Sequence, residues 1–144
     1  MDHRLEAACH CGDLRFVLTT ARAAGDLPYR ECRCEHCARR RPIYTADPDG
    51  EVAFELARGG ALVRYRFATA TADFISCARC GCLAGALCVV DGRPLAVLNA
   101  ALFRERPAAA PATIEAGGES PEARARRRAR TWTPVIRLPD GWAD

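Results

Sequence analysis

The segments CHCG at residues 9–12 and CARCGC at residues 77–82 decide how the chain is expected to fold. Each places a pair of cysteines on a short stretch of backbone, Cys9 with Cys11 and Cys77 with Cys80. Four thiolates in two such pairs suit a tetrahedral zinc ion, whose bonds to sulfur are ~2.3 Å long. A zinc site with four protein ligands is structural. We therefore predict that a zinc ion ties the N-terminal segment to the middle of the chain.

A third cluster of cysteines lies in the segment ECRCEHCARRR, residues 31–41. It supplies Cys32, Cys34 and Cys37, one thiolate fewer than a closed zinc site needs. Three protein ligands and one open position are typical of a catalytic or thiol-binding zinc. Two other interpretations stay open: a structural zinc completed by Cys82, His36 or another group, and a metal-free set of reactive thiols.

The size and composition of the chain favour one domain in a reducing compartment. We expect residues 1–144 to form a single domain, because this length is within the commonest range. Uncharged stretches are far shorter than the ~20 apolar residues that cross a membrane, and charges replace the apolar part of a signal peptide. We therefore expect no membrane contact and a cytoplasmic location, where the nine cysteines would be thiols or metal ligands rather than disulfides.

The charge of the chain does not favour nucleic acid as a partner. The formal net charge is +3, and seven thiolates bound to two zinc ions would bring it close to zero. Domains that bind nucleic acid are usually strongly basic. The run ARARRRAR at residues 123–130 is therefore interpreted as a solvent-exposed segment.

Alternation of apolar and polar residues predicts short strands at residues 14–18, 51–57 and 61–68. Asp91 and Gly92 stand between two apolar runs, and Asp-Gly predicts a type I′ hairpin because both turn positions need positive φ. The predicted fold class is mainly β, with little helix.

Residues 106–130 are expected to form a loop or a short helix within the domain. Residues 107–118 are rich in Ala, Pro and Gly, which is typical of a loop. Ser120 followed by Pro121 is typical of the first residues of a helix.

The chain carries four motifs in a fixed order: CHCGDLRF, CRCEHCAR, CARCGC and TWTPVIRLPDGW. This pattern resembles the glutathione-dependent formaldehyde-activating enzymes, a family whose domain is shared with centromere protein V. The resemblance implies small antiparallel sheets of the β-tent type, pinned by zinc. The chain departs from the family pattern at two places. Cys82 stands where Thr or Ser is usual, and the aromatic residue that usually comes immediately before the third cluster is here Phe74, three residues before Cys77.

The resemblance also implies two zinc ions with different roles. The implied ligands of the structural zinc are Cys9, Cys11, Cys77 and Cys80. The implied ligands of a labile, functional zinc are Cys32, Cys34 and Cys37, which would make these three residues catalytic.

The predicted function is that of a zinc-dependent carbon–sulfur lyase acting on a small thiol or its carbonyl adduct, of the glutathione and formaldehyde type. Guanidinium groups suit carboxylates, so the arginines near the three-cysteine cluster would bind the glutathione carboxylates. These predicted substrate-binding residues are Arg33, Arg39 and Arg40. Two other classes stay open: a non-catalytic module whose zinc ions only hold loops that contact protein or nucleic acid, and a redox protein whose thiolates react with oxidants.

Overall fold

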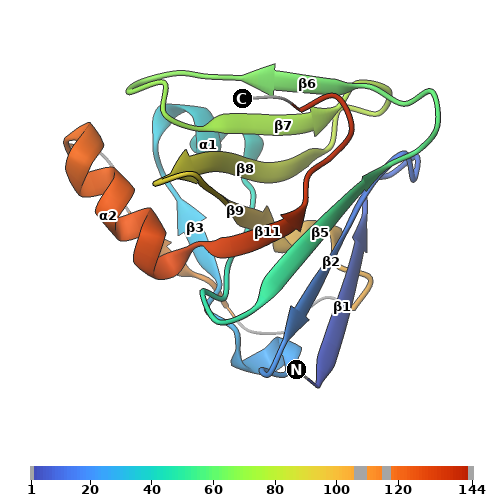
Figure 1. Ribbon diagram of the computed structural model, residues 1–144, viewed down its shortest axis with the longest axis horizontal. Helices are drawn as coiled ribbons and strands as arrows, with labels where there is room; N and C mark the ends of the chain where they lie inside the picture. Colours follow the sequence, from blue (N-terminus) through green and yellow to red (C-terminus); the bar gives the residue numbers. More distant parts are fainter. Residues whose placement is uncertain (1, 106–109, 115–117, 143–144) are drawn as a thin grey trace.

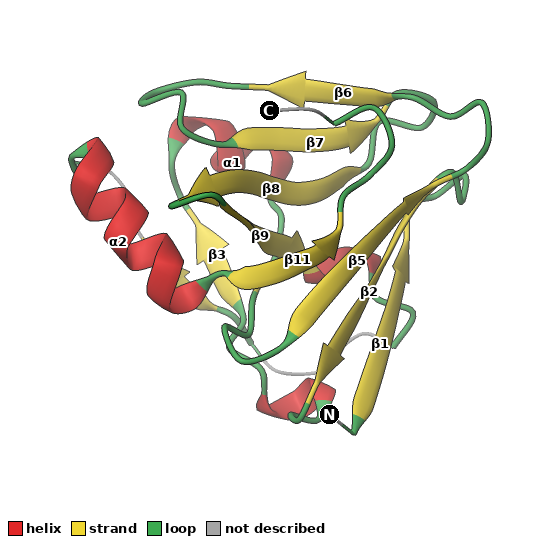
Figure 2. Ribbon diagram, viewed as in Figure 1, coloured by secondary structure: helices red, strands yellow, loops and turns green. Residues whose placement is uncertain are grey.

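The computed structural model describes residues 2–105, 110–114 and 118–142, and strands make up most of its regular structure (Figure 1, Figure 2). The strands, in chain order, are β1 (His3–Ala8), β2 (Leu14–Thr20), β3 (Arg30–Cys32), β4 (Tyr44–Thr45), β5 (Glu51–Leu56), β6 (Leu62–Tyr65), β7 (Asp73–Cys77), β8 (Leu83–Val90), β9 (Arg93–Asn99), β10 (Ala112–Ile114) and β11 (Thr133–Arg137). The helices are α1 (Glu35–Arg40), α2 (Pro121–Thr131) and the short 3-10 helices η1 (Ala24–Asp26) and η2 (Ala100–Leu102). The predicted mainly β class is confirmed.

Strand β11 joins two groups of strands. On one side, β1, β2 and β5 pair in that order, and β5 pairs in parallel with β11. On the other side, β11 pairs with β9, which is followed by β8, β7 and β6. β9 also pairs with β4, which leads through β3 to β10. Figure 1 shows the two groups inclined to each other, with β11 between them.

Most strand pairs are antiparallel, as predicted, but two are parallel. These are β5 with β11, and β3 with β10. In both pairs the second strand comes from the C-terminal third of the chain. A local sequence pattern cannot predict such pairings, because they depend on how a distant segment returns to the sheet.

The core lies between the inward faces of the two strand groups. In β2, Leu14, Phe16 and Leu18 are buried, and Val52 and Phe54 are buried in β5. Phe16 and Phe54 are opposite each other, with ring centroids 5.7 Å apart. Each such side chain contributes roughly 1.5–3 kcal/mol through its burial. The strands predicted at residues 14–18 and 51–57 are therefore confirmed. Within residues 61–68 only Leu62–Tyr65 forms a strand, β6, and none of its residues is buried.

The predicted hairpin at Asp91 and Gly92 is also confirmed. It connects β8 to β9, and Val90 pairs with Arg93 directly across the turn. Both turn residues have positive φ, 51° for Asp91 and 76° for Gly92, as a type I′ turn requires.

Between β7 and β8 the pairing contains a bulge that depends on a glycine. Ile75 pairs with Gly85, but Ser76 pairs with Leu83, so Ala84 is an extra residue in β8. Gly85 has a φ of 148°, and a Cβ at this position would lie 2.1 Å from the carbonyl oxygen of Val97. Glycine is therefore required at this position of β8, beside the paired strand β9.

Part of the predicted loop is a strand. Residues 112–114 form β10, which pairs in parallel with β3, while residues 106–109 and 115–117 lie outside the described residues. The helix α2 begins as predicted: Pro121 is in its first turn, and the Ser120 hydroxyl accepts a hydrogen bond of 3.1 Å from the Ala123 N–H. No helix in the described part of the chain is both long and apolar enough to cross a membrane.

A buried carboxylate holds the C-terminal segment against β7. Asp73 is only 2% exposed and accepts hydrogen bonds from Arg64, Arg66 and the indole N–H of Trp142. Burial alone would raise the pKa of Asp73, but these hydrogen bonds outweigh it and leave the pKa below its ordinary value. The Arg64 guanidinium also lies 5.3 Å from the centre of the Trp142 ring.

Candidate metal centres

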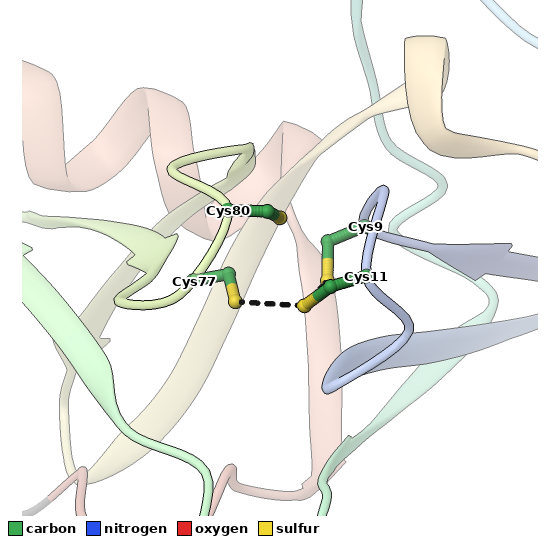
Figure 3. Close-up of side chains that lie close together, drawn as sticks. All are labelled: Cys9, Cys11, Cys77 and Cys80. Atoms are coloured by element: carbon green, nitrogen blue, oxygen red, sulfur yellow. Dashed lines mark hydrogen bonds between the residues drawn. The ribbon is translucent and has the colours of Figure 1, made fainter.

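The first group of cysteines joins two turns that are far apart in the sequence. Cys9 and Cys11 lie between β1 and β2, Cys77 ends β7, and Cys80 lies in the turn before β8. Figure 3 shows the four side chains pointing toward one another from these two turns. All four sulfurs lie within 4.8 Å of one another, so the group could hold a metal ion, as predicted.

The spacing and the chemistry of this group both fit zinc. The Cys9 and Cys11 sulfurs are 3.7 Å apart, and the Cys11 and Cys77 sulfurs are 3.5 Å apart. A tetrahedron with ~2.3 Å zinc–sulfur bonds has edges of about 3.8 Å. Hydrogen bonds from the backbone of Cys11 and Cys82 lower the pKa of the Cys80 thiol to about 5, which favours the thiolate form that binds metal.

The second group is built at the first turn of α1. Cys32 ends β3, Cys34 is the N-cap residue of α1, and Cys37 lies one turn into the helix. The Cys34 sulfur accepts a hydrogen bond of 3.4 Å from the Cys37 N–H, as N-cap side chains do. The three sulfurs lie within 4.8 Å of one another, so this group too could hold a metal ion.

Neighbouring groups shift the pKa values of the thiols in the second group. A hydrogen bond from Cys37 lowers the pKa of the Cys32 thiol to about 5. The Tyr44 hydroxyl lies 3.2 Å from the Cys37 sulfur, in a buried contact. Sequence reasoning did not identify Tyr44, because nothing in the local sequence indicates that β4 passes behind α1.

Neither of the two residues considered as a fourth ligand joins the second group. In the part of the chain that the structure describes, the group contains only the three cysteines. His36 Nδ1 lies 3.7 Å from the Cys37 sulfur, but its ring packs 4.7 Å from the ring centres of Phe67 and Phe74. Burial, with Arg40 adding to the effect, lowers the pKa of His36. Cys82 lies beside Cys80 on the other turn and belongs to neither group.

A cavity of about 170 Å³ opens beside the second group. The cysteines form part of one wall, together with Tyr44. Aromatic and aliphatic side chains form much of the remaining surface: Phe67, Phe74, Val97, Ile114 and Trp132. Four arginines also line the cavity: Arg30, Arg124, Arg127 and Arg128.

The arginines predicted to bind substrate lie elsewhere. Arg33, Arg39 and Arg40 are exposed, and none of them lines this cavity. Arg39 donates a hydrogen bond to the Glu35 carbonyl oxygen, and Arg40 donates one to the Gly81 carbonyl oxygen. Arg39 and Arg40 line a separate cavity that shares Phe67 and Phe74 with the first. The predicted contact of these arginines with a substrate carboxylate stays a prediction.

The arginine-rich run contributes to the cavity instead. The interpretation of residues 123–130 as solvent-exposed is wrong for one face of α2, because Arg128 is buried and Arg127 is partly buried. Arg124 lies three and four residues before these two, so all three lie on the same face of the helix. This spacing is the signal in the sequence that could have identified them.

Fold and site together describe a mainly β chain with two groups of cysteines suited to metal. No protein-family model and no curated protein matches the chain. The fold is similar to that of a Rhodobacter sphaeroides protein whose crystal structure was determined as a structural genomics target. The two chains share 19% sequence identity with a TM-score of 0.56, over 76% of this chain and 99% of the other. At this identity the similarity concerns the fold alone, and the resemblance to formaldehyde-activating enzymes stays a prediction.

Proposed function

We propose that the chain is a zinc-dependent enzyme that forms or cleaves a carbon–sulfur bond in a small thiol. Cys32, Cys34 and Cys37 would bind the zinc of the active site. The observation that carries this proposal is that the three-cysteine group forms part of the wall of a cavity, next to space that a small molecule can enter. The four-cysteine group would hold a structural zinc within a fold of the β-tent type.

The chemistry of the three-cysteine group supports a reaction at sulfur. A zinc ion bound there would act as a Lewis acid and favour the thiolate form of an incoming thiol. Tyr44 would hold the Cys37 sulfur in place through its hydroxyl. The apolar walls formed by Phe74 and Val97 would exclude water from the reacting sulfur.

The proposed reaction is the addition of a thiol to an aldehyde such as formaldehyde. The thiol sulfur bonds to the carbonyl carbon, the carbonyl double bond becomes a single bond, and the thiol proton ends on the oxygen as a hydroxyl. The reverse reaction breaks the same carbon–sulfur bond. Glutathione is the thiol that the sequence resemblance favours.

The test measures how fast glutathione and formaldehyde exchange with their S-hydroxymethyl adduct, by exchange NMR at equilibrium. We expect the zinc-loaded protein to accelerate this exchange, and Cys34→Ser to abolish the acceleration. Cys82→Ser is the matched control, because Cys82 belongs to neither cysteine group. If zinc-loaded protein leaves the exchange rate unchanged, a non-catalytic zinc-binding module becomes the better account.

A further inference from the structure

Two of the four arginines that line the cavity, Arg30 and Arg128, have no carboxylate partner in the described part of the chain. Arg30, Arg124, Arg127 and Arg128 line the cavity, and no Asp or Glu is among the described residues that line it. Arg127 is paired with Glu119, whose carboxylate accepts hydrogen bonds of 3.1 Å from its Nε. Neither Arg30 nor Arg128 forms an ion pair with a carboxylate in the described part of the chain.

Arg128 is the exceptional member of this set, because it is only 6% exposed. Its Nη1 donates a hydrogen bond of 2.9 Å to the Thr71 hydroxyl, and its guanidinium lies 4.7 Å from the centre of the Trp132 ring. Its Nε is buried without a hydrogen-bond partner among the described residues. These contacts fix the plane of the guanidinium but supply no counter-charge.

The neighbouring thiol does not neutralise Arg128 either. Burial raises the pKa of Cys88 to about 11, so this thiol is uncharged near pH 7. A buried charge without a partner is unfavourable by several kcal/mol, and native proteins usually pair such charges. A ligand that brings negative charge into the cavity would remove this penalty.

The space continues past Arg30. A second cavity, of about 310 Å³, shares Arg30, Tyr44, Val97 and Trp132 with the first. Two further arginines, Arg22 and Arg130, line it, and again no carboxylate is among the described residues that do so. The positive charge therefore extends away from the three-cysteine group.

We propose that these arginines bind the carboxylate of a small acidic ligand, and that Arg128 and Arg30 determine its specificity for negative charge. Guanidinium groups suit carboxylates because they can donate two parallel hydrogen bonds. This part of the proposal rests on the proposed function: the sulfur at the other end of the ligand would bind at Cys32, Cys34 and Cys37. The proposed substrate is therefore an acidic thiol, whose sulfur binds at the three-cysteine group and whose carboxylate binds at the arginines.

The test uses three probes and calorimetry with the zinc-loaded protein. The probes are 3-mercaptopropionate, its S-methylated derivative, and 3-mercaptopropanol, which keeps the thiol but has no carboxylate. We expect Arg128→Gln to weaken binding of both acids about tenfold or more, because a hydrogen bond to a charged group is lost, and to leave the alcohol unchanged. Arg126→Gln is the matched control, because Arg126 is an exposed residue of the same helix and lines neither cavity.

A second variant keeps the proposal testable if Arg128→Gln fails to fold. Arg30 is only partly buried, and Arg30→Gln should weaken both acids in the same way. Equal losses in Arg126→Gln, or an equal loss for the alcohol, would overturn the proposal. If the S-methylated acid binds as tightly as the thiol but still depends on Arg128, the carboxylate site stands and the proposed chemistry at sulfur fails.

Discussion

The pKa values of the Cys32 and Cys37 thiols shift in opposite directions. The interaction with Cys37 lowers the pKa of Cys32 to about 5, and the interaction with Cys32, together with burial, raises the pKa of Cys37. Near pH 7 the metal-free group therefore holds a thiolate beside a thiol that keeps its proton. Metal binding must release that proton, so metal affinity falls as the pH falls.

The cysteine groups could be predicted from sequence, because their short spacings bring sulfurs together on one turn of backbone. Arg128 could not be predicted in this way. Its burial depends on Thr71 and Trp132, and Thr71 lies on a loop 57 residues away. A pattern of arginines indicates a helix face, but only the folded chain shows which face is buried.

Serine at Cys80 and serine at Cys34 should have different effects. Cys80→Ser removes one of four ligands that join two distant turns, so we expect loss of soluble, folded protein. Cys34→Ser should keep the fold and lower the zinc content from two equivalents toward one. Mass spectrometry under native conditions and circular dichroism measure both effects. Equal destabilisation by the two substitutions would contradict the division into structural and functional sites.

Removing the Tyr44 hydroxyl tests the support for the Cys37 sulfur. Tyr44→Phe keeps the ring in the core and deletes only the group that lies 3.2 Å from that sulfur. Outer-shell partners of metal ligands typically contribute 10–100-fold to affinity. We expect zinc affinity at the three-cysteine group to fall about tenfold with the fold intact, as measured by competition with a chelating dye. An unchanged affinity would exclude this role for Tyr44.

At the scale of elements, the strands and the Asp91-Gly92 hairpin could be predicted because their signals are local. The strand β10 could not, since residues 112–114 lie in a segment rich in Ala and Pro. What makes it a strand is its parallel partner β3, which lies about 80 residues earlier in the chain. The need for glycine at residue 85 could not be predicted for the same reason, because it comes from the Val97 carbonyl oxygen of the neighbouring strand β9.

Gly85→Ala should strongly destabilise the fold. The added methyl group would lie 2.1 Å from the Val97 carbonyl oxygen, and the φ of 148° is unfavourable for any residue with a Cβ. We expect the free energy of unfolding in urea to fall by about 3 kcal/mol or more. Gly25→Ala is the control, because a Cβ there meets no atom within 4 Å. A comparable stability of the two variants would show that β8 can move away from β9.

Asp73→Asn should lower stability by an amount that does not change between pH 8 and pH 5. The pKa of Asp73 is lowered in the folded protein, so the carboxylate stabilises the fold above its unfolded pKa of ~3.9. That stabilisation is lost only as the pH falls through the lower, folded value. Because Arg64 and Arg66 are partly exposed, we expect a difference of about 2 kcal/mol in urea unfolding. If the difference already shrinks at pH 6, burial rather than the arginines determines this pKa.

At the scale of the whole molecule, the four-cysteine group and β11 connect the same two groups of strands in different ways. Strand β11 pairs with β5 on one side and with β9 on the other. The cysteine group joins the turn of the β1–β2 hairpin to the turn between β7 and β8. Cys11 and Cys77, one from each turn, are 66 positions apart in the sequence. The first connection uses backbone hydrogen bonds, and the second would depend on a metal ion bound by the four cysteines. The relative placement of the two strand groups is therefore expected to depend on metal.

Stepwise removal of zinc should show this dependence directly. A four-thiolate zinc contributes roughly 10–16 kcal/mol of apparent binding free energy, most of it coupled to folding, whereas a site with three protein ligands holds its metal less tightly. With increasing chelator we expect the zinc at Cys32, Cys34 and Cys37 to leave first, with the sheet signal in circular dichroism unchanged. The second zinc should leave only together with that signal, because the sulfurs of Cys9 and Cys77 would then no longer hold the two turns together. Cys34→Ser is the matched control, since it should show only the second step. Loss of both zinc ions in a single step, together with the sheet signal, would mean that the three-cysteine group is as structural as the other, and the case for an active site there would fail.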